Sequence, residues 1–180
     1  MVRSFTTEPV LDDSLARVLA AGLAAPSAGH VQAVDLLVVD APARYWEITL
    51  ADREGFRWQG LLDAPVLVIP VVSPDAYAAR YAEPDKRDTG LGDVEAWPVP
   101  YWWVDGGMAV EAMLLAAVAE GLGACFFGLF SHERAVLDAF GVPADRRAVG
   151  TVALGHPLPD APGRSATRPK RRDRVHRGRW

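Results

Sequence analysis

The middle of the chain is dominated by the apolar stretch DGGMAVEAMLLAAVAEGLGACFFGLF, residues 105–130. Residues 106–122 are almost continuously apolar and are interrupted by Glu111 and Glu120. This pattern predicts a helix that is buried in the core or in a subunit interface. The glycines of the GLG triplet stop the helix, and the apolar residues 124–130 behind it predict a short strand or loop.

Six further segments have the patterning of secondary structure. The run PVLVIPVV, residues 65–72, is apolar on both faces and is therefore expected to be the central strand. Asp12 or Asp13 is expected to cap the first helix, and Ser131 the last. The other predicted elements are helices over residues 14–23, 43–52 and 133–140, and strands over residues 36–39 and 149–154.

Length and composition describe an ordinary globular protein. The 180 residues favour a single domain, and half of them are apolar while 23% are charged. The one cysteine, Cys125, excludes an intramolecular disulfide framework, and its apolar surroundings predict a buried, inert thiol. None of the four histidines stands at ligand spacing from another on a helix, so we expect no metal site.

No targeting or membrane segment is expected. The N-terminal sequence MVRSFTTEPV lacks the apolar region of a secretory signal. The apolar run 108–122 is shorter than the roughly 20 residues that span a bilayer. We therefore expect a soluble, cytoplasmic protein without a membrane partner. The chain also lacks the G-x-S-x-G, P-loop and Rossmann patterns.

Charge is distributed unevenly along the chain. The net charge is −4, yet eight of the 19 basic residues lie in the C-terminal arm, residues 164–180. Such an arm could bind nucleic acid, but the acidic remainder of the chain would repel a duplex. An arm that holds a small anion or an acidic partner surface fits this balance better.

Residues 73–103 form a lid-like insertion with weak periodicity. They contain four prolines and the rings of Trp97, Tyr101, Trp102 and Trp103. Segments of this length without clear structure are often lids or binding loops. Two interpretations stay open: a surface loop pinned by a few rings, or a cover over an active site.

Four segments carry motifs in order along the chain, at residues 3–10, 25–32, 105–130 and 154–180. Together they resemble the nitroreductase family of flavin enzymes. Arg3-Ser4-Phe5, followed by Pro9-Val10, resembles the family's opening Arg-x-Phe…Pro-Val. The sequence APSAGHVQ, residues 25–32, is similar to its A-P-S-x-x-N-x-Q-P-W, with histidine in place of the asparagine. Residues 105–130 resemble its long central helix, its G-L-G-x-C element and the glycine segment behind the flavin.

The fourth segment lies at the end of the chain. LGHP at residues 154–157 resembles the family's L-G-Y-P, and Lys170-Arg171-Arg172 resembles a basic phosphate clamp. Val175-His176…Trp180 is similar to a closing V-H…W. The family's usual N-terminal Arg-x-Ser would lie upstream of Met1.

The resemblance implies an α+β fold with a central, mostly antiparallel sheet flanked by helices. It also implies an intertwined homodimer with two FMN sites at its interface. The implied reaction is a ping-pong hydride transfer in which NAD(P)H reduces FMN, and the flavin then reduces a nitroaromatic, a quinone or a similar small-molecule acceptor. No side chain is needed as an acid or base, so no catalytic residue is expected.

The resemblance also suggests which residues bind the cofactor. Lys170 and Arg172 suit the phosphate, because cations bind phosphate through charge-assisted hydrogen bonds. Arg3 is expected near N1 and O2 of the flavin, where a cation stabilises the reduced, anionic form. The small-residue turn of Pro26, Ser27 and Ala28 is expected to approach the flavin, and Gln59 is a candidate for a polar contact at the flavin edge. The rings of Phe126 and Phe127 are expected to pack on the flavin, and Gly128 and Leu129 to offer backbone N–H groups near N5.

Two other functions stay open from the residues alone. The protein could bind flavin without turnover, as a sensor or a store. Less favoured is a nucleic-acid-binding domain with a basic tail. Flavin absorbance of the purified protein separates both flavin hypotheses from the third, and bleaching by NADH or NADPH separates the enzyme from the store.

Overall fold

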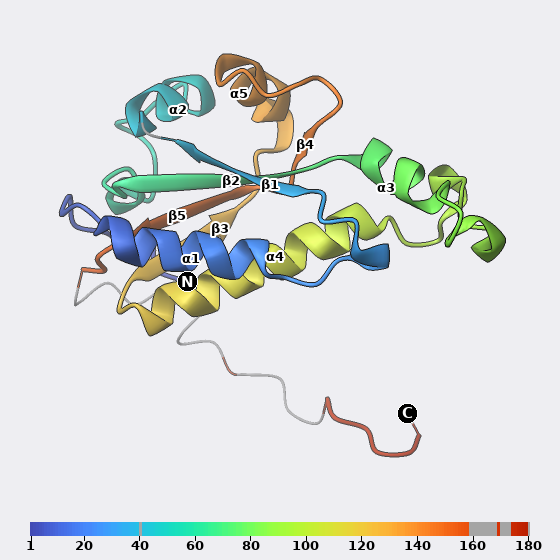
Figure 1. The fold of residues 1–180 in the computed structure, drawn as a ribbon. Coiled ribbons are helices and arrows are strands. Elements are labelled where there is room, and N and C mark those ends of the chain that lie inside the picture. Colours follow the sequence, from blue (N-terminus) through green and yellow to red (C-terminus); the bar gives the residue numbers. More distant parts are fainter. Residues whose placement is uncertain (40, 159–168, 170–173, 180) are drawn as a thin grey trace.

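The computed structural model describes residues 1–39, 41–158, 169 and 174–179, and its architecture is α+β (Figure 1). Within these residues five strands form one sheet in which every paired neighbour is antiparallel. The strand order is β1 (Val34–Val39), β2 (Val66–Val72), β5 (Thr151–Gly155) and β3 (Gly123–Phe127), and the short β4 (Arg147–Ala148) also pairs with β2.

The central position predicted for the 65–72 run is confirmed by the pairing of β2 on both sides. Successive side chains of a strand point to opposite faces of a sheet. Accordingly Leu67 and Ile69 lie in one core cluster and Val68 lies in the other, and all three are fully buried. The sheet therefore has an apolar core on each face.

Helices cover both faces of the sheet (Figure 1). α1 (Asp12–Leu23) and α4 (Tyr101–Ala119) pack together on one face, where a Cβ added to Gly22 would lie 2.7 Å from Cγ of Met113. α2 (Pro42–Thr49) and α5 (Glu133–Ala139) lie on the other face. α3 (Pro74–Tyr81) projects beyond the end of the sheet, with the rest of the 73–103 segment around it.

Helix α4 has one buried and one exposed apolar side. Met113 and Ala117 are fully buried in the core cluster between α1, α4 and the sheet. On the opposite side Leu115 is 62% exposed and Val118 is 71% exposed. By length and composition alone α4 could cross a membrane. Its packing on α1 and the sheet gives it the place of a core helix in this fold.

Several predicted boundaries are wrong for local reasons. α1 begins at Asp12 after Leu11, without a side-chain cap, so its first-turn acids act on the helix dipole instead. Ser131 lies within the 3₁₀ turn Phe130–His132 and does not cap α5. α4 begins five residues before Gly106, because Pro100 is its N-cap and the rings of residues 101–103 continue the helix.

The 73–103 segment is more regular than its periodicity predicts. Ser73 caps α3 by accepting a hydrogen bond from the N–H of Ala76, and Pro74 occupies the first turn. Trp97 lies at the centre of an aromatic cluster and contacts four other rings. Those rings are Tyr77, Tyr81, Tyr101 and Trp102.

Candidate functional site

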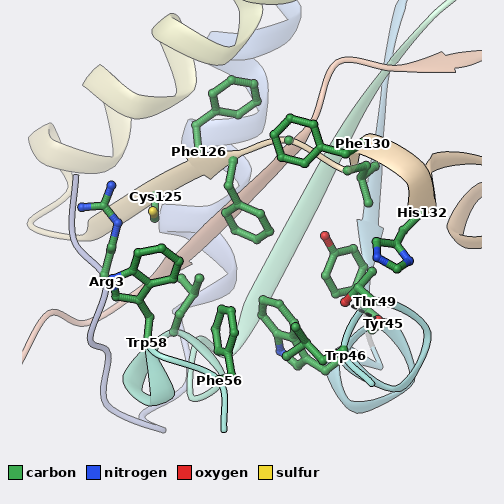
Figure 2. A pocket seen from close by; sticks show the side chains of 15 residues that line it. Arg3, Tyr45, Trp46, Thr49, Phe56, Trp58, Cys125, Phe126, Phe130 and His132 are labelled. Carbon is green, nitrogen blue, oxygen red and sulfur yellow. Dashed lines mark hydrogen bonds between the residues drawn. The ribbon is translucent and has the colours of Figure 1, made fainter. Parts of the chain in front are cut away.

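A pocket of about 470 Å³ opens on the face of the sheet that carries α2 and α5 (Figure 2). Its walls come from α2, from the 49–61 segment, from β3 and from the turn that follows β3. The N-terminal segment adds one residue, Arg3. The full lining is Arg3, Tyr45, Trp46, Thr49, Leu50, Phe56, Trp58, Leu61, Cys125, Phe126, Phe127, Gly128, Leu129, Phe130 and His132.

Aromatic rings form most of the wall, as Figure 2 shows. Trp46 and Phe127 stack with ring centroids 5.9 Å apart and an interplanar angle of 17°. Tyr45 meets Trp46 edge to face at 4.9 Å, and Phe56 meets Trp58 in the same way at 5.7 Å. Flat apolar walls of this kind suit a planar ring system.

One end of the pocket carries a positive charge. Among the described lining residues Arg3 is the one with a permanent positive charge, and its guanidinium lies 5.8 Å from the ring centroid of Trp58. Arg57 approaches the same indole ring, at 5.7 Å, but does not line the pocket. An anionic or electron-rich group would therefore find its counter-charge at Arg3.

Burial affects two titratable side chains of the pocket, Tyr45 and Cys125. Burial raises the pKa of Tyr45 to about 12, although its hydroxyl shares a 2.8 Å hydrogen bond with Oγ1 of Thr151, which acts in the opposite direction. Burial also raises the pKa of the Cys125 thiol. The burial predicted for Cys125 is confirmed, and the raised pKa favours the protonated thiol at neutral pH.

The turn after β3 presents backbone and an exposed ring at the pocket mouth. Phe130 has a left-handed φ of 47° and its side chain is 88% exposed. Its ring lies over Gly128, where a Cβ would come within 3.0 Å of Cζ. No hydrogen bond within the described part of the chain uses the backbone N–H of Gly128 or Leu129. These groups are free to bind a ligand acceptor.

The sequence-predicted cofactor residues separate into groups. Arg3 meets Phe126, Phe127, Gly128 and Leu129 in the lining of the pocket, although more than 120 residues separate Arg3 from these four consecutive residues. Lys170 and Arg172, with Arg171, lie outside the described residues.

Pro26 and Ser27 line a different hollow, of about 320 Å³, where α1 ends and β1 begins. Ala28 stands beside it and donates its backbone N–H to Oδ2 of Asp105 over 2.8 Å. Asp105 also lines this hollow and is 1% exposed. A single chain therefore does not bring the Pro26–Ala28 turn to the aromatic pocket.

Gln59 has a local structural task. Its Nε2 donates to the carbonyl oxygens of Arg53, Glu54 and Phe56, at 2.6, 3.0 and 2.8 Å. Gln59 does not line the pocket. It supports the loop that presents Phe56 to the pocket.

Sequence reasoning missed the aromatic wall formed by Tyr45, Trp46, Phe56 and Trp58, and the exposed His132. The available signal was the density of rings between residues 45 and 58. No residue of the 73–103 segment lines this pocket.

Comparison with known proteins identifies the family. The model of the Nitroreductase family matches residues 1–52 and 42–156. The chain belongs to the nitroreductase family. This makes it an oxidoreductase, and the α+β fold inferred from sequence is confirmed. A protein of Archaeoglobus fulgidus, named for NADH dehydrogenase or NAD(P)H nitroreductase activity, is 26% identical over 182 residues, which cover 99% of this chain and 92% of the relative.

Two further proteins that match this chain have a flavin in their names. An NADPH-flavin oxidoreductase of Vibrio harveyi is 26% identical over 158 residues. The match covers 87% of this chain and 61% of the relative. A Desulfovibrio desulfuricans structure of nitroreductase type, solved in complex with FMN, superposes with a TM-score of 0.66. It is 25% identical, and the match covers 90% of this chain and 83% of the other.

Proposed function

We propose that this nitroreductase-family protein is an FMN-dependent oxidoreductase that uses NAD(P)H to reduce nitroaromatic, quinone or similar acceptors by a ping-pong reaction. The observation that carries the proposal is the aromatic pocket with Arg3 at one end and the unpaired backbone N–H groups of Gly128 and Leu129 in its wall. The names of the flavin-linked Vibrio and Desulfovibrio proteins support the same cofactor class.

The pocket fits the ring system of FMN in size and chemistry. Its volume lies in the range of about 300–1,000 Å³ that small-molecule sites occupy. The Phe127 ring would pack on the flavin, and the N–H groups of Gly128 and Leu129 would bind its acceptor atoms. The Phe126 ring packs against the core cluster on the opposite face of the sheet, so the expectation that both rings pack on the flavin is wrong for Phe126. Lys170 and Arg172 remain the proposed phosphate ligands, because Arg3 is the one cation among the described lining residues.

When bound, FMN would supply the hydride chemistry by accepting and returning two electrons. The residues of the chain would orient and screen the ring. Arg3 would favour negative charge at the nearby ring edge, and the stacked Trp46 and Phe127 would exclude water from one side. Burial favours the protonated, neutral forms of Tyr45 and Cys125 beside the ring.

We also propose that the protein acts as a homodimer. The exposed apolar side of α4 around Leu115 and Val118 is the kind of surface that a partner covers. A second copy would also supply what one chain lacks at its pocket, namely the Pro26–Ala28 turn. By the same reasoning the 73–103 segment would cover the acceptor site of the partner subunit, since it lines none of its own pocket.

Reconstitution tests the cofactor assignment. Protein incubated with excess FMN and desalted should retain about one FMN per chain, and its Tm should rise because a ligand of the folded state stabilises that state. Saturating FMN that changes neither the Tm nor the flavin fluorescence would contradict the proposal. Retained FMN that NADH and NADPH both fail to bleach would favour a flavin-binding protein without turnover.

A further inference from the structure

The turn between α1 and β1 has an unusual backbone. Gly29, His30 and Gln32 all have left-handed φ values, 62°, 55° and 52°. Side-chain-bearing residues adopt this region at a conformational cost, and they do so where the surrounding structure holds them. Ser27 closes the turn by accepting the backbone N–H of Gln32 at its Oγ, over 3.0 Å.

A buried carboxylate holds the start of this turn. Oδ2 of Asp105, in the first turns of α4, accepts the backbone N–H of Ala28 over 2.8 Å. The same oxygen accepts the hydroxyl of Tyr77 over 2.6 Å. Tyr77 belongs to α3 and is fully buried, and this burial raises its pKa above the ordinary range, so the hydroxyl stays a donor. Asp105 therefore links α3 to the turn.

Two more residues of α3 contact the next residue of the turn. Nε of Arg80 donates to the carbonyl oxygen of Gly29 over 2.9 Å. The other guanidinium nitrogens of Arg80 bind Glu83 and Asp85, which fixes the side chain. The ring of Tyr81 lies against Gly29, where a Cβ would come within 3.1 Å of it. Helix α3 thus contacts the turn directly at Gly29 and is linked to Ala28 through Asp105 of α4.

We propose that Tyr77 and Asp105 are positioning residues that fix the 27–32 turn in the geometry in which it binds the cofactor. The turn supplies Ser27 and Ala28 to FMN in the proposed function, on which this inference rests. A turn that is fixed before FMN arrives loses less conformational entropy on binding. The Tyr77–Asp105–Ala28 chain of hydrogen bonds therefore sets the FMN affinity without touching FMN.

Four variants of the full-length chain test the relay, that is, the Tyr77–Asp105–Ala28 chain of hydrogen bonds. Tyr77→Phe removes the hydroxyl and keeps the ring among its aromatic neighbours. Asp105→Ala removes the oxygen that accepts both hydrogen bonds, whereas Asp105→Asn keeps a carbonyl oxygen that can accept from Tyr77 and Ala28. Tyr81→Phe is the matched control, because it removes a hydroxyl from the same helix that makes no hydrogen bond within the described residues.

Hydrogen exchange of the FMN-free protein provides a readout independent of activity. Tyr77→Phe and Asp105→Ala should speed exchange in peptides covering residues 26–33 by roughly fivefold to tenfold, the effect of one lost hydrogen bond. Peptides of β2 should exchange at the wild-type rate. Asp105→Asn and Tyr81→Phe should match the wild type. Unchanged exchange over residues 26–33 in both disrupting variants would overturn the proposal, as would an equal rise throughout the chain.

FMN titration separates this inference from the proposed function. The Kd for FMN should rise about threefold to tenfold in Tyr77→Phe and stay within about twofold of wild type in Tyr81→Phe. Faster exchange of the turn with an unchanged Kd would overturn the link to cofactor affinity. A wild-type chain that binds no FMN would instead refute the proposed function, and the exchange result would still decide whether the relay holds the turn.

Discussion

Trp46 and Phe127 stack almost in parallel, 5.9 Å apart, although they come from α2 and from the end of β3. Both rings line the pocket, but Trp46 is 2% exposed and belongs to the core, whereas Phe127 is half-buried. The stacked pair therefore contributes both to the stability of the core and to the shape of the candidate site. Substitutions at the two positions should have separable effects.

Phe127→Leu should weaken FMN binding more than it weakens the fold. Leucine keeps much of the buried volume but removes the flat face, so we expect a loss of about 0.5–1.5 kcal/mol in FMN binding from the missing ring contact. Phe140→Leu is the control, because Phe140 packs on the same core and does not line the pocket. Equal FMN affinities for the two variants would argue against flavin at this wall.

Trp46→Ala, in contrast, should lower the free energy of unfolding by about 3–5 kcal/mol, as truncations of large buried rings do. Urea unfolding monitored by circular dichroism measures this loss. A change below about 1 kcal/mol would mean that Trp46 is less important to the core than its burial indicates.

Arg3 and Arg57 both lie over the ring of Trp58, yet only Arg3 lines the pocket. Arg3→Gln should make the midpoint potential of bound FMN more negative, because a cation near the ring stabilises its reduced, anionic form. A loss of about 1.4 kcal/mol corresponds to about 30 mV for a two-electron couple. Arg57→Gln should leave the potential unchanged. Equal shifts in both variants would indicate a general charge effect.

The fold was largely predictable from local patterns, and the site was only partly so. The 65–72 run is apolar on both faces, and such a strand has few alternatives to a central position. The helix α3 was hidden because it is short and lies between prolines, and because the carboxylate that binds Tyr77 is 28 residues away. Trp46, Phe56 and Trp58 converge with β3 only through tertiary packing, which no local pattern contains.

The basic C-terminal arm should bind the cofactor phosphate. Replacing Lys170 and Arg172 together by alanine should weaken FMN binding by about 2–5 kcal/mol, since two charge-assisted contacts are lost. Riboflavin, which has no phosphate, should bind the double variant and the wild type equally. Unchanged FMN affinity combined with lost affinity for an oligonucleotide would favour a nucleic-acid arm instead.

The ring cluster of the 73–103 segment should influence the acceptor step. Tyr101 is 45% exposed and contacts Trp97 alone among the neighbouring rings, so Tyr101→Ala should leave the segment folded. We expect a lower kcat/KM for a nitroaromatic acceptor and an unchanged Kd for FMN. Trp97→Ala should instead unpack the segment, because four ring contacts are lost. Wild-type acceptor kinetics in Tyr101→Ala would contradict a covering role.

The anaerobic absorbance spectrum of the FMN-loaded protein, recorded before and after NADPH and then after a nitroaromatic or quinone acceptor, tests the central claim most directly. The account predicts that NADPH, or NADH in a parallel sample, bleaches the visible flavin band, and that the acceptor restores it without oxygen. A band that neither nicotinamide bleaches, or a bleached band that no such acceptor restores, would contradict an FMN-dependent NAD(P)H oxidoreductase.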